Sequence, residues 1–215
     1  MVSALGTTTN FLIFLTCLMI KNKIKPRHTF IRNIFHGASY LSSFKRQWLT
    51  SLWGAELHNV YSSTEIIGRA VEDEEGYFVF QPFNVVEVYD PWSREVIDEG
   101  IGLVMVTCLY PFVQLQPRIR YLTNDFVMTT KAADGQTKYK FIGRLENAAC
   151  ECIDGRCRPS IPPVFLYDIL DSLEGICRQP TSEDMNRLGG DISSNFGRPV
   201  FKSVFVTLPP RVYQG

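Results

Sequence analysis

The chain has 215 residues, enough to bury a hydrophobic core in one large domain or two small ones. Apolar residues make up 45% of it and charged residues 20%, as in an ordinary folded protein. Its 22 Lys and Arg balance its 22 Asp and Glu, and no basic stripe alternates with aromatic residues, so we expect no nucleic-acid partner.

The N-terminal stretch raises the question of a membrane segment. Residues 2–20 carry no charge, and Lys21, Lys23, Lys25 and Arg27 follow as a possible positive flank. Only about ten of these residues are strongly apolar, whereas a spanning helix needs roughly 20. A signal peptide carries its positive charge before the apolar run, not after it. We therefore expect a buried helix and no membrane partner.

Three helices are predicted from periodicity and capping residues. The first begins after the possible N-caps at residues 7–10, runs to about Lys23, and is ended by Pro26. The second covers 44–53 after Ser42 or Ser43, with Gly54 as its stop. The third covers 163–173.

Strands are predicted where β-branched and aromatic residues gather between turn residues. In the first part of the chain we expect strands at 29–35 and 57–61, and a last strand at 200–208. The middle third is predicted to be a small, mostly antiparallel β-subdomain. Its expected strands cover 77–80, 85–89, 103–109, 119–122, 126–130 and 139–142.

Six cysteines in a chain of this size do not indicate a disulfide scaffold, so we expect a cytoplasmic protein with reduced thiols. The dipeptide Asp154-Gly155 predicts a tight hairpin that places Cys152 opposite Cys157. Together with Cys150, and with Cys177 as a fourth ligand, these thiols could bind a soft metal. The spacing is not a common zinc pattern, and half-buried thiols on a hairpin are the favoured interpretation.

Three separated segments carry the strongest functional pattern. The first joins 36–38 (His-Gly-Ala) to 59–65 (Asn-Val-Tyr-Ser-Ser-Thr-Glu). The second joins 102–107 (Gly-Leu-Val-Met-Val-Thr) to 119–125 (Ile-Arg-Tyr-Leu-Thr-Asn-Asp), and the third is 141–144 (Phe-Ile-Gly-Arg). Each alone would also fit a core aromatic, a helix cap or a turn, but those explanations do not account for the shared order.

In this order and at these separations, the segments resemble the adenylate-forming (ANL) superfamily of acyl-CoA synthetases. The nearest branch comprises the phenylacetate–CoA ligases and the capsular-polysaccharide ligase-like proteins. The family patterns are a Gly-Gly-Glu turn, YGxTE, GELVxT, RYRTGD and GR. The resemblance covers about residues 5–175.

The resemblance implies an ATP or AMP site. Tyr61 would stack on adenine, Asp125 would accept hydrogen bonds from both ribose hydroxyls, and Arg144 would help to fix the ribose at the hinge to a mobile lid. Gly37 would let the backbone approach the nucleotide closely.

The catalytic candidates implied by the resemblance are Thr64 and Glu65. The Thr64 hydroxyl would bind the α-phosphate, and Glu65 would hold Mg²⁺, a hard ion satisfied by one or two carboxylates and phosphate oxygens. CoA is a possible second cofactor. The substrate would be a carboxylic acid, which ATP activates before its acyl group passes to CoA or another thiol.

Three residues depart from the family patterns: Ser62 replaces the glycine of YGxTE, Ala38 the glutamate of the Gly-Gly-Glu turn, and Asn124 the glycine of RYRTGD. Asn tolerates a left-handed backbone better than most residues. Ala38 removes a polar contact.

The family's Lys-ended phosphate-binding loop is expected upstream of Met1, and its catalytic lysine beyond Gly215, so both are absent from these 215 residues. Most of the charge that stabilises the transition state is then missing. We therefore expect an incomplete ligase with little or no activity alone. The alternatives are a non-catalytic remnant that acts through protein contact, with a partner chain or dimer covering apolar surface around 11–20, and the cysteine metal module.

The implied fold class is α/β (mixed α+β). Residues 1–143 would form the C-terminal portion of the AMP-binding large domain, including the antiparallel β-subdomain. Residues 144–215 would form a shortened α+β lid.

Overall fold

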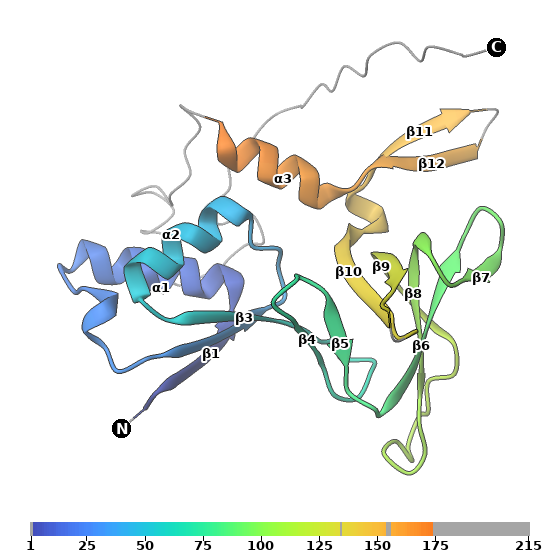
Figure 1. The fold of residues 1–215 in the computed structure, drawn as a ribbon, viewed down its shortest axis with the longest axis horizontal. Helices are drawn as coiled ribbons and strands as arrows, with labels where there is room; N and C mark the ends of the chain where they lie inside the picture. The colour runs from blue at the N-terminus through green and yellow to red at the C-terminus, as the bar shows by residue number, and fades with distance from the viewer. Residues whose placement is uncertain (1, 134, 154–155, 174–215) are drawn as a thin grey trace.

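The computed structural model describes residues 2–133, 135–153 and 156–173, and the side chains of these residues outside 149–160. Its first part alternates strands and helices (Figure 1). Strands β1, β2 and β3 pair in parallel, and helices α1 and α2 lie together over one face of them. The elements are β1 Ala4–Thr8, α1 Thr9–Lys21, the 3-10 turn η1 Pro26–His28, β2 Asn33–Gly37, α2 Ser43–Trp53 and β3 Glu56–Tyr61.

Local capping sets the ends of both helices. The Thr8 hydroxyl accepts a hydrogen bond from the Phe11 amide at the start of α1, and Ser42 caps α2 through the Lys45 amide. Gly54 ends α2 with φ +60°, a left-handed conformation that glycine adopts without strain. Both predicted helices are confirmed, and Ser42, not Ser43, is the cap.

The middle part is antiparallel, as predicted, and continues the same sheet. One ten-stranded sheet has the order β1-β2-β3-β4-β5-β10-β9-β8-β6-β7. One buried cluster of its antiparallel part contains Val88, Val104, Val106 and Val127, with aromatic rings packed beside them. The added strands are β4 Ala70–Glu72, β5 Phe78–Phe80, β6 Asn84–Asp90, β7 Glu95–Ile97, β8 Gly100–Cys108, β9 Tyr121–Lys131 and β10 Thr137–Arg144.

Several strand predictions are wrong in their bounds. Residues 26–28 form η1 because Pro26 fixes its own φ, so the strand predicted at 29–35 begins only at Asn33. The two strands predicted at 119–122 and 126–130 are one strand, β9, which passes through Asn124 with φ +63°. Strands β1, β4 and β7 were not predicted.

The chain then forms a hairpin and a helix. These are the 3-10 turn η2 Leu145–Asn147, β11 Ala149–Ile153, β12 Arg156–Ile161 and α3 Pro163–Ser172. The backbone register confirms that Cys152 lies opposite Cys157. The side chains of Cys150, Cys152 and Cys157, all of Cys177, and the strand predicted at 200–208 lie outside what the structure describes.

Helix α3 packs against α2 through two acidic residues. Lys45 Nζ lies 3.0 Å from Asp171 Oδ1, and both side chains are only 5% exposed. One oxygen of Asp168 accepts a hydrogen bond from the Tyr40 hydroxyl, and the other accepts one from the Ser43 amide at the start of α2. An amide in the first turn of a helix has no partner within the helix, so Asp168 satisfies a donor that would otherwise be free.

Gly37 is required where β2 passes β3. A Cβ atom at this position would lie 2.2 Å from the carbonyl oxygen of Val60, closer than any real contact. Close packing between β2 and β3 therefore explains why residue 37 is a glycine.

The N-terminal stretch is expected from its sequence to form a buried helix and not a membrane-spanning segment. The helix found there, α1, has 13 residues. Among the described residues, no helix combines the length and the apolarity needed to cross a bilayer.

Candidate nucleotide site

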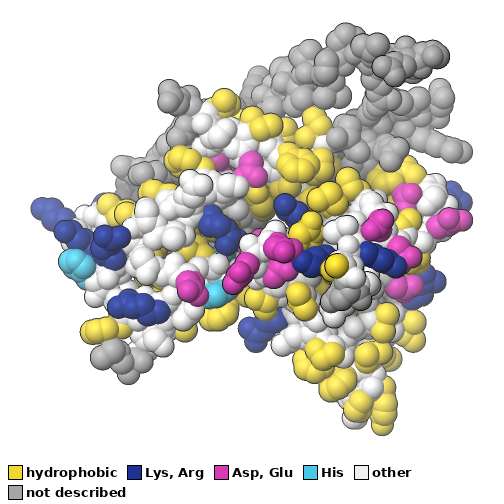
Figure 2. Space-filling view, viewed as in Figure 1, with side chains coloured by type: hydrophobic (Ala, Val, Ile, Leu, Met, Phe, Trp, Pro, Cys, Tyr) yellow, Lys and Arg dark blue, Asp and Glu magenta, His cyan; other side chains and the backbone are white. Residues whose placement is uncertain are grey.

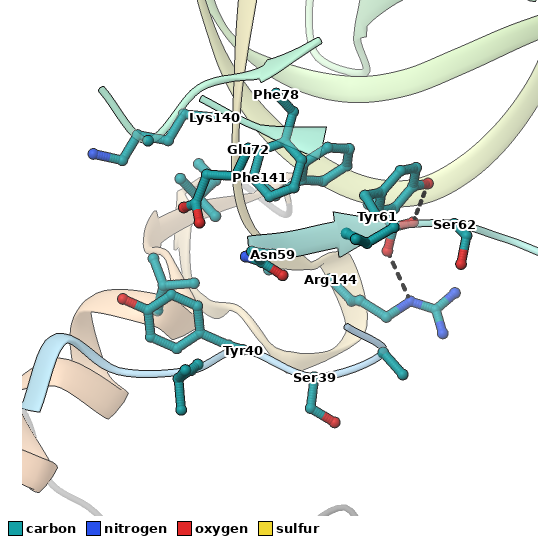
Figure 3. Close-up of a pocket in the computed structure, with 18 of the residues that line it drawn as sticks. Ser39, Tyr40, Asn59, Tyr61, Ser62, Glu72, Phe78, Lys140, Phe141 and Arg144 are labelled. Carbon is teal, nitrogen blue, oxygen red and sulfur yellow. Dashed lines mark hydrogen bonds and ion pairs between the residues drawn. The ribbon is translucent and has the colours of Figure 1, made fainter. Parts of the chain in front are cut away.

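A cavity of about 650 Å³ opens where the two halves of the sheet meet (Figure 3). This volume is typical of small-molecule sites. The loop after β2 (38–41), the end of β3 with the loop that follows it (59–65), the end of β10 (140–144) and one side of α3 form its walls. Five of the six sequence-predicted site residues line it: Tyr61, Thr64, Glu65, Asp125 and Arg144. Gly37 is not among the lining residues.

Tyr61 forms the aromatic side of the cavity at the end of β3. Its ring stacks on Phe141 of β10, with the ring centroids 3.9 Å apart and the planes 22° apart. Its hydroxyl donates to Asp125 Oδ2 at 2.8 Å. Burial, followed by the Asp125 charge, raises the pKa of the Tyr61 hydroxyl far above its usual value, so this group stays protonated and acts as a donor.

Asp125 connects the second and third motifs. Arg144 Nε lies 3.1 Å from Asp125 Oδ1, on the other carboxylate oxygen from the Tyr61 hydroxyl (Figure 3). Burial raises the pKa of Asp125, while the Tyr61 hydrogen bond, the Arg144 charge and a hydrogen bond from Thr123 oppose this shift. Since a carboxylate offers about four acceptor positions, these partners leave capacity for a further hydroxyl donor.

Thr64 and Glu65 lie in the loop that leaves β3. The Ser63 hydroxyl donates a hydrogen bond to the Glu65 carboxylate. This hydrogen bond is the main reason that the pKa of Glu65 lies below its usual value. Glu65 is therefore an ionised carboxylate at the cavity, which suits a hard cation that also has phosphate oxygens to bind.

The departures from the family patterns take defined conformations. Asn124 adopts a left-handed backbone, with φ +63°, which Asn tolerates better than most residues. Ala38, which lines the cavity, also has positive φ, +67°. This conformation is uncommon for a residue with a Cβ, so the turn after β2 holds Ala38 in a strained backbone beside the cavity.

Sequence reasoning missed the residues that complete the cavity. Asn59 lies two residues before Tyr61, so strand alternation places both on one face, and this signal could have identified it. Arg46 of α2 pairs with Glu72 of β4 at the other end of the cavity. Nothing in the sequence pattern links these two residues, which only the folded sheet brings together.

His36 lies in the core behind the Ala38 turn and is 1% exposed. The Thr9 hydroxyl donates to the Ser39 carbonyl oxygen at 2.8 Å and therefore accepts from His36 Nδ1–H at 3.0 Å. His36 Nε2 has no partner among the described residues. Burial, with smaller effects of Arg46 and His58, lowers the pKa of His36 from 6.5 to about 4.

We expect this histidine to make the fold less stable in mild acid. The unfolded chain binds a proton at His36 near pH 6.5, but the folded chain does so only near pH 4. Stability should therefore fall as pH decreases between these values, by up to about 3 kcal/mol. Urea unfolding at pH 7.5, 6 and 5 measures the free energy of unfolding. Its decrease with falling pH should be smaller in His36→Leu than in the control variant His58→Gln. An equal decrease in both variants would contradict this assignment.

No group of three His, Cys, Asp or Glu side chains suited to a metal occurs among the residues searched, which exclude the cysteine hairpin. The cysteine-metal hypothesis therefore remains a prediction.

The known proteins that are similar to this chain, as given below, are CoA ligases. No protein-family model matches the chain. A phenylacetate-coenzyme A ligase of Thermus thermophilus is 27% identical over 119 residues, which are 53% of this chain and 26% of the relative. A 2-hydroxyisobutyryl-CoA ligase structure, solved in the postadenylation state with an AMP adduct, superposes on 81% of the chain with a TM-score of 0.64 and 20% identity.

A benzoate CoA ligase from Burkholderia xenovorans LB400 superposes on the same share with a TM-score of 0.57 and 16% identity. The chain has the fold of the corresponding part of these CoA ligases. It covers only 38% and 36% of the two solved chains. The predicted mixed α/β class is confirmed by this match. The antiparallel strands, predicted as a small subdomain, belong to one ten-stranded sheet with the parallel strands.

Proposed function

We propose that the cavity binds the AMP part of ATP or of an acyl-adenylate. The observation that carries this proposal is the contact between three motifs far apart in sequence: Tyr61, Asp125 and Arg144 meet at one cavity, at 2.8 and 3.1 Å. A structural role alone does not require that a carboxylate only 15% exposed lines a cavity next to Thr64 and Glu65.

In this proposal each residue has a defined task. Tyr61 offers a ring that Phe141 supports from behind, so little entropy is lost when adenine stacks on it. Asp125 accepts from the ribose hydroxyls with the acceptor positions that Tyr61 and Arg144 leave open. Arg144 is 52% exposed and can shift toward the ribose without a burial cost.

Thr64 would donate its hydroxyl to the α-phosphate, and Glu65 would be the protein ligand of Mg²⁺. The fit for Mg²⁺ rests on one ionised carboxylate, which suffices only when phosphate oxygens complete the shell. Bound there, the ion would neutralise charge on the phosphates. Gly37 would contribute indirectly, because its lack of a side chain lets β2 and β3 approach where the cavity begins.

The activity proposed for the complete architecture is activation of a carboxylic acid by ATP and acyl transfer to CoA or another thiol. The neighbour described above was solved with an AMP adduct, and another structure of the same ligase with CoA as well. We place the domain boundary at Gly143-Arg144, so that 144–215 act as the lid, and α3 contributes Phe165 and Asp168 to the cavity wall.

Titration calorimetry of the chain with AMP, and with ATP and Mg²⁺, tests the proposal. We expect a weak Kd, on the order of 0.1–1 mM, because this chain offers no phosphate-loop lysine. No acyl-adenylate should form from ATP and a carboxylic acid. Robust acyl-adenylate formation by these 215 residues would contradict the expected weak activity, and a folded chain that binds no nucleotide would contradict the site.

A folded chain that binds no nucleotide would favour the second candidate, a role through protein contact. Parallel sheets are normally covered on both faces, but α1 and α2 cover only one face of β1–β3 (Figure 1). On the other face Phe35 is 39% exposed and stacks on His58 at 4.8 Å. Among the described residues no helix covers this face, so it, more than α1, is the surface that a further polypeptide layer or a second copy would cover.

A further inference from the structure

The strongest surface feature outside the cavity is the basic end, which we define as residues 20–32. It contains the end of α1, the turn that follows, η1 and the approach to β2. Figure 2 shows Lys and Arg side chains gathered at the left end of the molecule beside a histidine. The five cations of the basic end are all exposed: Lys21, Lys23, Lys25, Arg27 and Arg32.

Charge is distributed very unevenly along the chain. Residues 1–55 contain seven Lys or Arg and no Asp or Glu. Because the whole chain has a formal net charge of zero, the other residues carry a net charge of −7. Among the described residues, none of the five cations of the basic end forms an ion pair with a carboxylate.

Ordinary fold requirements explain only part of this pattern. The negative end of the α1 dipole favours Lys21, but that effect is confined to the last turn of the helix. Arg27 and Arg32 donate to backbone carbonyl oxygens, for which a positive charge is not needed. The fold therefore leaves most of this positive charge without an assigned partner in the described chain.

Large apolar side chains alternate with these cations and point to the kind of partner. Ile20 is 45% exposed, Ile24 52% and Phe30 58%. Single exposed apolar residues are normal. A short segment that combines them with clustered Lys and Arg is typical of proteins that lie on anionic membranes, where cations meet headgroup phosphates and apolar side chains enter the acyl boundary.

The basic end is ordered before any partner binds. The Ile24 amide donates to the Met19 carbonyl oxygen at 2.8 Å, and the Thr29 hydroxyl donates to the Pro26 carbonyl oxygen at 2.7 Å. Pro26 itself is buried. Because these contacts fix the turn that carries Ile24 and Phe30, little conformational entropy remains to be lost on binding.

We propose that the basic end docks the protein onto an anionic lipid bilayer, with its cations on the headgroups and with Ile24 and Phe30 in the acyl boundary. The sequence expectation of no membrane partner considered only spanning and signal segments, and this proposal revises it. A nucleic acid also offers phosphates but has no apolar layer for Ile24 and Phe30, so the bilayer is the better match.

Co-sedimentation of the whole chain with phosphatidylcholine vesicles, with and without phosphatidylserine, tests the proposal. We expect binding only to the anionic vesicles, and its loss as salt rises from about 0.1 to about 1 M. The triple variant Lys21→Gln, Lys23→Gln, Lys25→Gln should bind about 100-fold more weakly, at about fivefold per cation. Phe30→Ser should bind at least about tenfold more weakly.

The matched control removes three exposed cations elsewhere: Arg69→Gln, Arg94→Gln, Lys131→Gln. It should keep wild-type binding, and thermal melts should show that all variants remain folded. If the control variant lost binding to anionic vesicles to the same extent, the effect would be due to net charge alone, and the proposal would be overturned. Equal binding to neutral vesicles would also overturn the proposal. So would displacement of the protein from the vesicles by duplex DNA, if Phe30→Ser leaves binding to the vesicles unchanged.

Discussion

Replacing Asp125 with alanine is expected to weaken AMP binding by about 100-fold. In the proposed site Asp125 accepts from two ribose hydroxyls, and each hydrogen bond to a charged acceptor contributes about tenfold or more. The substitution also removes the acceptor of the Tyr61 hydroxyl and the partner of Arg144. Calorimetry should show no saturation at concentrations that saturate the wild type.

The control for this variant is Asp98→Ala, which removes an 80% exposed carboxylate paired with Lys131 far from the cavity. It should bind AMP as the wild type does. Because Arg144 is half exposed, Asp125→Ala should stay folded at room temperature, which circular dichroism can verify. Unchanged AMP affinity in a folded Asp125→Ala chain would remove the ribose role.

The second large effect is expected at the buried pair between α2 and α3. Lys45→Ala should destabilise the fold by about 3–5 kcal/mol, because it leaves the Asp171 carboxylate buried without its cation. Chemical denaturation measures the change in the free energy of unfolding. The loss should be largest for the packing of α3, which forms one wall of the cavity.

A double variant separates charge burial from packing. Lys45→Met with Asp171→Leu replaces the pair by apolar side chains of similar size, and it should recover most of the stability lost in Lys45→Ala. Lys131→Ala, which breaks an exposed pair, should cost no more than about 1 kcal/mol. A Lys45→Ala chain as stable as Lys131→Ala would mean that solvent reaches this pair.

The sequence predicted best where the signal is local. A serine cap at Ser42 or Ser43 and the Gly54 stop identified α2, because a cap depends on residues within one helical turn. The hairpin register at Cys152 and Cys157 followed from the two-residue turn.

Prediction failed where a strand exists only because a neighbour pairs with it. Strands β4 and β7 have three residues each, too few to show an alternating pattern. Strand β9 was predicted as two strands because Asn124 is a typical turn residue. In the structure β9 pairs with β8 on both sides of Asn124, at Leu122 and at Phe126, with a register shift between these two pairs. The sequence also could not show why residue 37 must be glycine, because the crowding atom, the Val60 carbonyl oxygen, belongs to a neighbouring strand.

The sequence alone predicted the resemblance to acyl-CoA ligases, through the order and spacing of the motifs around Tyr61, Asp125 and Arg144. It also predicted the presence of α1 and α2, from capping residues close to their ends. Only the tertiary structure decided that Tyr61 and Asp125, 64 residues apart, share a hydrogen bond, and that Lys45 neutralises Asp171 inside the fold. Such contacts arise from sheet order and helix packing, and no local pattern encodes which distant groups those bring together.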